Sequence, residues 1–273
     1  MPLPANTPCS RVDGPNVTAN TITLADLIGN EREPLLTRTL EKTRLIIFNR
    51  PDARNALTRD MRRNLARQLS LADADDSVDC IILTGAHGVF TAGSDIRESR
   101  ANPGPLVRPH PGEALRATGK PLLALVDGPC VTGGLEIALS CTLVIASDRA
   151  RFADTHAKIG IFPAWGQTAL LPRAIGSRRA RQMMLTGEFI DATTARDWGI
   201  TNEVIPSADL LARGLEIARA ISACDARSVR WLSDIWRDQD GLGLEQALVL
   251  EEAAVSRWRA NLPRYADHPD NQE

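Results

Sequence analysis

The sequence has few aromatic side chains, little net charge and no long apolar segment. Aromatic residues make up 4% of its 273 residues, with five Trp, five Phe and one Tyr, which argues against a platform that stacks nucleic-acid bases. A formal net charge of −2 favours neither nucleic acid nor an anionic membrane surface. No apolar run is long enough to cross a bilayer. We therefore expect neither nucleic acid nor a membrane as a partner.

The cysteines indicate neither a metal site nor a disulfide framework, because they are odd in number, scattered and spaced unlike zinc ligands. They are Cys9, Cys80, Cys130, Cys141 and Cys224. Cys80, Cys130 and Cys141 have apolar surroundings and are predicted to be small buried side chains in a reducing compartment. The N-terminus also lacks the basic and apolar regions of a signal peptide. These features favour a cytoplasmic protein without a bound metal.

Apolar runs and amphipathic segments alternate through the first half of the chain. Three continuously apolar runs are typical of strands covered on both faces: Cys80–Thr84, Leu122–Val126 and Leu143–Ala146. A further strand is predicted at Leu45–Phe48, and Thr58 is placed to cap a helix whose apolar residues recur at helical spacing. Strands separated by helices predict an α/β fold with parallel strands.

Beyond Trp165 the chain is predicted to be mainly helical. Helices are expected at Gln167–Ala174, Ser177–Leu185, Thr193–Trp198, Ala208–Ala223, Ala226–Arg237 and Leu244–Arg259, and a strand at Glu203–Ile205. The last helix carries an apolar stripe through Leu244, Leu248 and Val255, which must pack on the core or on a neighbouring subunit. At the other end, residues 1–30 are predicted to form a mobile arm with a short ordered piece at Leu24–Ile28.

Two glycine turns, at residues 91–97 and 131–136, carry the strongest functional signal. Each follows an apolar strand-like run and leads into a helix. Glycine lets the backbone turn tightly there and leaves N–H groups facing outward. Two such turns can aim two amide donors at one acceptor and stabilise a developing oxyanion. The sequence therefore predicts a site that holds a carbonyl oxygen and does chemistry beside it.

A set of motifs in fixed order accompanies these turns. They are Asn49-Arg50-Pro51 with Asn55-Ala56-Leu57, Phe90-Thr91-Ala92-Gly93-Ser94-Asp95-Ile96, Gly133-Gly134-Leu135-Glu136, Phe152-Ala153-Asp154, and Gly160-Ile161-Phe162-Pro163 leading to Gly166. With them the chain resembles the crotonase superfamily, also called the enoyl-CoA hydratase/isomerase family, from about Leu35 to Pro206. The resemblance implies a crotonase-like spiral of ββα units over residues 31–206 and a helical region at 207–273 that builds trimers, often paired into hexamers. It also implies a coenzyme A thioester ligand, with no separate cofactor because coenzyme A is part of the substrate.

The resemblance also assigns roles to residues. It places the backbone N–H groups of Ser94 and Gly133 in the oxyanion hole and makes Glu136 the group that activates water. The residues expected to contact the coenzyme A thioester are Arg54, Ala92, Ser94, Asp95, Ile96, Arg97 and Gly133. Guanidinium groups match phosphate oxygens, so Arg97 and Arg54 are candidates for the coenzyme A phosphates, the alternative being solvated surface arginines. Asp95 is also predicted to cap the helix that follows the turn.

The chain departs from the family pattern at a position beside the predicted base. The second catalytic glutamate of the best-known hydratases falls on His156. A neutral imidazole there can transfer the α-carbon proton, or it can hydrogen-bond locally and orient Glu136 without moving protons. Asp154 would share the face of His156 on a strand and could pair with it. The alternative for Asp154 is to bind backbone N–H groups in a turn.

The leading hypothesis is an enoyl-CoA hydratase that adds water reversibly to a 2-enoyl-CoA and gives a 3-hydroxyacyl-CoA. An enolate held in the oxyanion hole would be the intermediate. Two alternatives stay open. One is another reaction through the same enolate, namely isomerisation, decarboxylation or thioester hydrolysis, and its motive is His156. The other is a non-catalytic acyl-CoA-binding protein. A homotrimer or a dimer of trimers is expected in each case.

Overall fold

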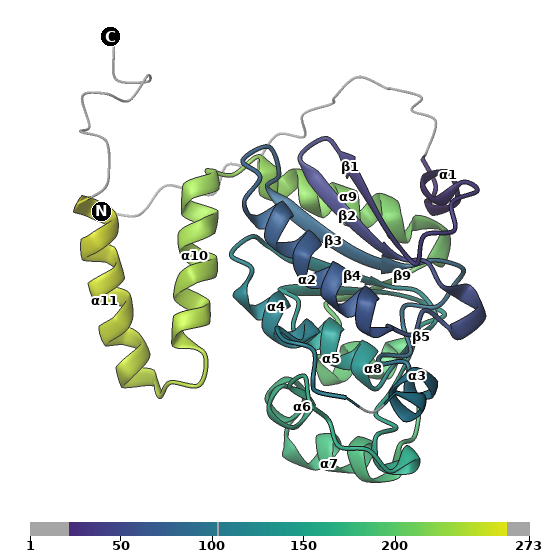
Figure 1. The fold of residues 1–273 in the computed structure, drawn as a ribbon. Helices are drawn as coiled ribbons and strands as arrows, with labels where there is room; N and C mark the ends of the chain where they lie inside the picture. The colour runs from purple at the N-terminus through teal and green to yellow at the C-terminus, as the bar shows by residue number, and fades with distance from the viewer. Residues whose placement is uncertain (1–21, 103, 261–273) are drawn as a thin grey trace.

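The computed structural model describes residues 22–102 and 104–260. Its centre is a six-stranded sheet with the order β1-β2-β3-β4-β6-β9 (Figure 1). These strands are β1 Leu35–Leu40, β2 Thr43–Phe48, β3 Cys80–Gly85, β4 Leu122–Val126, β6 Leu143–Ser147 and β9 Glu203–Ile205. β1 and β2 pair antiparallel, and every other neighbouring pair is parallel. The predicted α/β class is confirmed.

Both faces of the sheet are buried, which explains why its inner strands read as unbroken apolar runs. Along β3, Ile81 and Leu83 belong to the core on one face, and Cys80 and Ile82 to the core on the other. The first core is covered by α2 Arg59–Asp73 and α4 Pro111–Ala117, the second by α1 Leu24–Ile28 and α9 Leu210–Ser222. α9, the first helix of the expected 207–273 region, therefore packs on the sheet.

A second sheet, of three strands, positions the two glycine turns. Its order is β5-β7-β8, with bounds Pro129–Val131, Arg151–Ala153 and Ile190–Asp191. A parallel bridge joins Thr91 to Cys130 of β5, so the first glycine turn lies beside the strand that leads to the second. α3 Ile96–Ala101 follows the first turn and α5 Gly133–Leu139 follows the second.

The remaining described elements are α6 Gln167–Ile175, α7 Ser177–Thr186, α8 Ala192–Trp198, α10 Ala226–Gln239, α11 Leu244–Ala260 and the short 3₁₀ turns Pro51–Ala53, Ala157–Ile159 and Ser207–Asp209. The short ordered piece predicted before the sheet is α1. Cys80 and Cys130 are buried as predicted, whereas Cys141 is only half-buried, and Cys9 lies outside the described residues. None of the described helices is long and apolar enough to cross a lipid bilayer.

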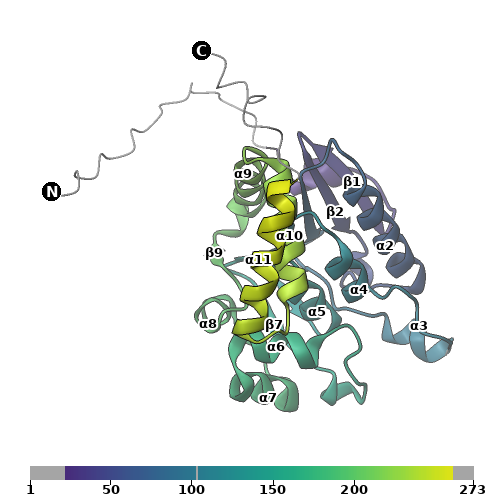
Figure 2. The same ribbon diagram turned by 90° about the vertical axis from the view of Figure 1, so that its left-hand side faces the viewer.

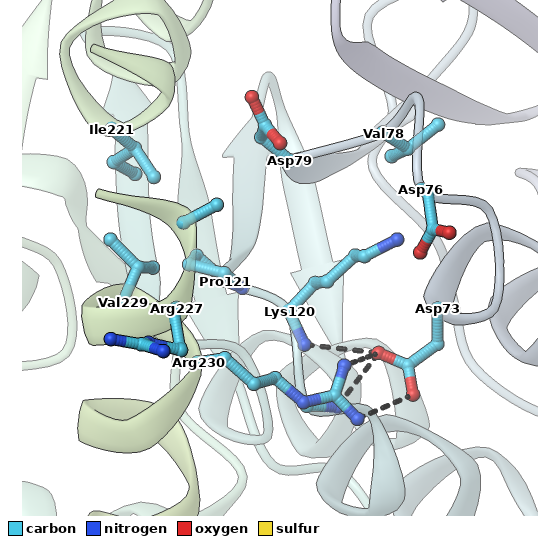
Figure 3. A pocket seen from close by; sticks show the side chains of 12 residues that line it. Asp73, Asp76, Val78, Asp79, Lys120, Pro121, Ile221, Arg227, Val229 and Arg230 are labelled. Atoms are coloured by element: carbon cyan, nitrogen blue, oxygen red, sulfur yellow. Dashed lines mark hydrogen bonds and ion pairs between the residues drawn. The ribbon is translucent and has the colours of Figure 1, made fainter. Parts of the chain in front are cut away.

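α10 and α11 form a hairpin that lies beside the sheet-bearing body (Figures 1 and 2). Arg230 of α10 anchors it, donating to Asp73 at the end of α2 through Nη1 at 2.8 Å and Nη2 at 3.3 Å (Figure 3). The same carboxylate accepts the N–H groups of Gly119 and Lys120. A cavity of about 300 Å³ opens at this anchor, next to the start of β3. The glycine turn at residues 91–97 follows the opposite, carboxyl end of β3.

Within residues 22–102 and 104–260, much of the apolar stripe of α11 is left exposed. Leu244 is 76% exposed and Leu248 is 55% exposed. On the facing helix, the side chains of Leu232 and Trp236 are also exposed. Of the two alternatives given for the stripe, packing on the core of the same chain is therefore wrong for these residues.

Candidate active site

The two glycine turns converge, as their sequences predicted. A Cβ on Gly93 would lie 2.5 Å from the nitrogen of Gly133 and 2.7 Å from its Cα. A Cβ on Gly133 would lie 3.0 Å from the Cα of Gly93. The approaches at Gly93 are closer than a Cβ tolerates and the one at Gly133 is tight, so the two glycines let the backbones meet. Residues remote in sequence thus present adjacent backbone amides.

Hydrogen bonds to Leu57 orient the amide of Ser94. The N–H of Leu57 donates to the carbonyl of Gly93 at 2.7 Å, and its carbonyl accepts the N–H of Asp95 at 2.9 Å. Ser94, between these two residues, turns its own N–H away from Leu57, as in any extended pairing. Gly133 opens α5, where the first amides have no acceptor within the helix. Across residues 22–102 and 104–260, neither of these two N–H groups has a protein acceptor.

Asn55 and Arg50 build the first turn from within, a role that the sequence had not predicted. The fully buried Asn55 accepts the N–H of Arg50 with its side-chain oxygen at 2.8 Å and donates to the carbonyl of Val89 at 2.6 Å. The hydroxyl of Thr91 donates to the carbonyl of Asn55 at 2.7 Å. The Arg50 guanidinium reaches Asp95 Oδ2 at 2.5 Å. These family motifs therefore serve to fix the turn.

Asp95 caps α3, which confirms the prediction for this residue. Its Oδ1 accepts the N–H of Glu98 at 3.0 Å. Burial alone would raise the pKa of Asp95, but hydrogen bonds from Glu98 and from the Arg50 guanidinium hold it below its ordinary value. The carboxylate is thus committed to the helix start and to Arg50, and it holds Ser94 in place next to it.

Glu136 lies one turn into α5 and is clamped by main-chain donors. Its side chain is only 2% exposed. Oε1 accepts the N–H of Trp165 at 2.7 Å and the N–H of Gln167, at the start of α6, at 3.1 Å. Burial raises the pKa of this carboxyl, although the two hydrogen bonds and His156 act in the opposite direction. A carboxylate with a raised pKa is a stronger base, and its second oxygen remains available.

His156 faces that second oxygen across a short gap. Asp154, fully buried, accepts from His156 Nδ1 at 2.5 Å and from the backbone N–H of His156 at 3.0 Å. Because a carboxylate only accepts, the ring proton of a neutral His156 lies on Nδ1, and Nε2 points to Glu136 Oε2 at 3.7 Å. That distance is too long for a direct hydrogen bond. At this separation a single water molecule can hydrogen-bond to both atoms.

The Asp154–His156 pair forms through a turn and not through a strand. β7 ends at Ala153, and His156 has helical backbone angles, with φ −52 and ψ −50. The strand argument for a shared face was therefore wrong, although the pair exists. The alternative role of Asp154 is also present, since the same carboxylate oxygen binds the backbone N–H of His156.

The residues expected to contact coenzyme A gather along the first turn. The N–H of Ala92 donates to the carbonyl of Arg54 at 3.1 Å, which places Arg54 beside the turn. Ile96 begins α3 and is half-buried, and Arg97 follows it. Arg54 and Arg97 are both exposed, and neither forms an ion pair with another described residue. Both guanidinium groups are therefore accessible to an anionic ligand.

Trp165 and Gln167 complete the site, and the sequence had not predicted Gln167 to take part in it. Trp165 is 5% exposed and belongs to the core, and its ring atom Cζ3 lies where it would come within 2.6 Å of a Cβ on Gly133. It therefore packs in the core and also borders the backbone of Gly133. The sequence held one local signal for the backbone donors to Glu136. This is Gly166, whose φ of 128 turns the chain into α6.

Comparisons with known proteins show similarity over most of the chain. The family model described as "Enoyl-CoA hydratase/isomerase" matches residues 41–260. A probable peroxisomal enoyl-CoA hydratase of Arabidopsis thaliana is 35% identical over 223 residues, which is 81% of this chain and 84% of the relative. A 4-chlorobenzoyl coenzyme A dehalogenase of an Arthrobacter species is 36% identical over 188 residues, which is 65% of this chain and 68% of the relative.

The same likeness holds among solved structures. The crystal structure of an enoyl-CoA hydratase from Mycobacterium avium has a TM-score of 0.70 and 38% sequence identity, covering 84% of this chain and 98% of that one. The fold, the ordered motifs and the match over most of the chain lead to one conclusion: the protein is a member of the enoyl-CoA hydratase/isomerase family, within the crotonase superfamily.

Proposed function

We propose that this protein is an enoyl-CoA hydratase, which adds water to the 2,3 double bond of an enoyl-CoA thioester. The observation that carries the proposal is the contact of Gly93 with Gly133 one helical turn from Glu136. It supplies two backbone donors and a base to one bound thioester. Relatives named as enoyl-CoA hydratases, similar over most of this chain, support the same reaction.

In the proposed mechanism, the N–H groups of Ser94 and Gly133 bind the thioester oxygen. Glu136 Oε2 removes a proton from water as the water oxygen forms a bond to C3. The electron pair of the double bond moves toward the carbonyl and gives an enolate whose oxygen the two amides stabilise. C2 then takes a proton from the newly protonated Glu136, either directly or through His156 Nε2, which first accepts that proton from Glu136. The sum of the steps is the addition of one water molecule, and no separate cofactor takes part.

Known magnitudes make this set of groups sufficient for a large rate enhancement. Each well-aligned oxyanion donor contributes roughly 3 kcal/mol to the transition state. A positioned general base contributes roughly 10²–10⁴-fold in rate. Glu136 suits the second role because its raised pKa increases proton affinity while Oε1 stays fixed by two amides.

For substrate binding, we assign the strip Ser94–Arg97 with Ala92 and Arg54 to the pantetheine and phosphate portions of coenzyme A. The support is position: the strip continues directly from the oxyanion turn, and both guanidinium groups are exposed. A planar guanidinium fork binds phosphate oxygens in pairs. Because the fork is preorganised, less entropy is lost for each hydrogen bond that forms.

For assembly, we propose a homotrimer or a dimer of trimers formed through the C-terminal helices. The support is the exposed apolar surface on α10 and α11, which includes Leu244 and Leu248. The division at residues 206 and 207 stays a prediction, and so does the cytoplasmic location. Light scattering on the wild type and on Leu248→Glu tests the assembly, with a smaller particle expected for the variant.

A second reaction through the same enolate is the main rival. His156 at the position of the second glutamate motivates it, and the relative named as a dehalogenase shows that this family includes other chemistry on coenzyme A thioesters. Such an enzyme would keep the oxyanion amides and use Glu136 or His156 differently. The products distinguish the two proposals.

The deciding experiment is a panel of 2-enoyl-CoA and other acyl-CoA substrates of several chain lengths. Hydration removes the ultraviolet absorbance of the conjugated thioester and adds the mass of one water. An isomer of unchanged mass, a loss of carbon dioxide or the release of free coenzyme A would each replace hydration by the corresponding alternative. Binding without turnover across the whole panel would favour the acyl-CoA-binding protein.

A further inference from the structure

Thr132, immediately before the oxyanion residue Gly133, has an unusual backbone conformation. Its φ is 58 and its ψ is −114. L-residues rarely adopt positive φ, and a branched Cβ makes that conformation worse. The side chain is nevertheless buried, with 5% exposure. A conformation of this kind persists only where its surroundings hold it, and such residues cluster at functional sites.

The contacts that hold Thr132 come from the segment that carries His156. The N–H of Thr132 donates to the carbonyl of Ala153 at 2.9 Å. Its hydroxyl oxygen lies 2.6 Å from the hydroxyl oxygen of Thr155. The backbone N–H of Thr155 also donates to the Thr132 hydroxyl, at 3.4 Å. Two hydroxyls and two amides thus join the two loops.

The position of Thr155 links this contact to the chemistry. Its neighbours in sequence are Asp154 and His156, which form the carboxylate–imidazole pair that faces Glu136. The neighbour of Thr132 is Gly133, whose N–H is an oxyanion donor in the proposed mechanism. The hydrogen bond between the hydroxyls of Thr132 and Thr155 therefore bears on both the direction of the Gly133 N–H and the position of the His156 imidazole.

We infer that the Thr132–Thr155 hydroxyl pair is a positioning device for the oxyanion hole and His156. The inference rests on the proposed function. The pair touches no reacting atom; it fixes the peptide before Gly133 in a strained orientation and keeps the His156 loop against it. Losing one whole oxyanion donor costs about 10²–10³-fold in kcat, so misdirecting one donor is expected to cost about tenfold.

Thr132→Val tests the inference, because valine keeps the branched shape and the burial and removes only the hydroxyl. Thr132→Ser is the rescue variant, since serine restores the hydroxyl. Thr201→Val is the matched control, for Thr201 is 4% exposed and its hydroxyl donates to the carbonyl of Val144 at 2.7 Å, away from the glycine turns. Thr155→Val removes the partner hydroxyl.

Two readouts separate positioning from folding. The first is kcat and KM for hydration. The second is the near-ultraviolet absorbance of a bound 3-oxoacyl-CoA, which rises when the oxyanion hole stabilises its enolate. Thr132→Val and Thr155→Val are expected to lose about tenfold in kcat and to weaken the enolate signal, with KM within about threefold. The double variant is expected to lose no more than either single one, because both remove the same contact.

The possible results decide between the claims. Thr132→Ser with wild-type kcat and enolate signal supports the inference, as does wild-type behaviour of Thr201→Val. If Thr132→Val and Thr155→Val keep wild-type values beside an active wild type, the inference is wrong and the proposed function stands. If wild type neither hydrates an enoyl-CoA nor binds the enolate, the proposed function fails and takes this inference with it.

Discussion

Replacement of Glu136 by glutamine removes one negative charge and leaves the hydrogen bonds around it in place. The glutamine oxygen can still accept the N–H groups of Trp165 and Gln167, so the start of α6 should keep its position. What is lost is the base, which contributes roughly 10²–10⁴ in rate, or about 3–5 kcal/mol of transition-state stabilisation. We expect kcat for hydration to fall by that factor while the Kd for a saturated acyl-CoA changes less than about threefold, since the oxyanion amides remain.

The same substitution predicts a pH-dependent change in stability. In the folded protein, burial raises the pKa of Glu136 above its ordinary value of 4.5, so the folded state binds this proton more tightly than the unfolded state. The wild type therefore loses stability as pH rises from the unfolded pKa through the raised folded pKa, by about 1.4 kcal/mol for each unit between them. Glu136→Gln has no such loss. Its stability relative to wild type should increase across that window and then level off.

Ultraviolet absorbance assays give kcat for hydration, and calorimetry gives Kd for the saturated acyl-CoA. Urea unfolding at a series of pH values gives the difference in stability between Glu136→Gln and wild type. Glu188→Gln is the control, because Glu188 is exposed and takes no part in the site. A variant of Glu136 that hydrates within about threefold of wild type would refute its role as the base. A stability difference that shrinks with rising pH would refute the account of its pKa.

Three further variants test other parts of the site. Gly93→Ala should lower kcat at least 100-fold, because its Cβ would lie 2.5 Å from the nitrogen of Gly133. Gly176→Ala is the control, since Gly176 has a similar φ of 80 and open space around it, and it should lower stability alone. Equal losses of activity in the two variants would contradict this reasoning. Asp154→Asn should lower kcat about tenfold or more and shift its pH profile, because an amide can donate to the imidazole and favour the other tautomer. An unchanged profile would count against a role of the Asp154–His156 pair in proton transfer. Arg97→Glu should raise KM for the coenzyme A ester about tenfold and leave KM for the matching pantetheine thioester unchanged; equal effects on both would remove the phosphate assignment.

The central sheet could be predicted where local sequence decides it. The apolar run Leu122–Val126 coincides with β4, because burial on both faces requires apolar residues throughout. The predicted strand Glu203–Ile205 coincides with β9, which is half-buried at the edge of the sheet. The strands β5, β7 and β8 have only two or three residues each. No periodicity can be read in so few positions, and these strands exist only through pairing with segments distant in sequence.

The candidate site, too, could be predicted from the sequence only in part. The glycine turns and Glu136 could be placed from sequence because their residue types carry the signal. The clamp on Glu136 could not, because its donors are main-chain N–H groups that every residue except proline possesses. The Asp154–His156 pair was predicted through strand geometry and is formed by a turn, since β7 ends one residue before Asp154. The hydroxyl contact of Thr132 likewise depends on the pairing of β5 with β7.

The backbone clamp has a consequence for how this enzyme can change. Side chains at positions 165 and 167 can be exchanged without disarming Glu136, provided that proline is avoided at both. Trp165, which borders the oxyanion amides, is therefore open to mutation in a library that seeks new acyl groups. The main-chain donors to Glu136 and the side chain that borders Gly133 occupy one short stretch of chain yet are different atoms, so selection can change the side chain while the donors persist.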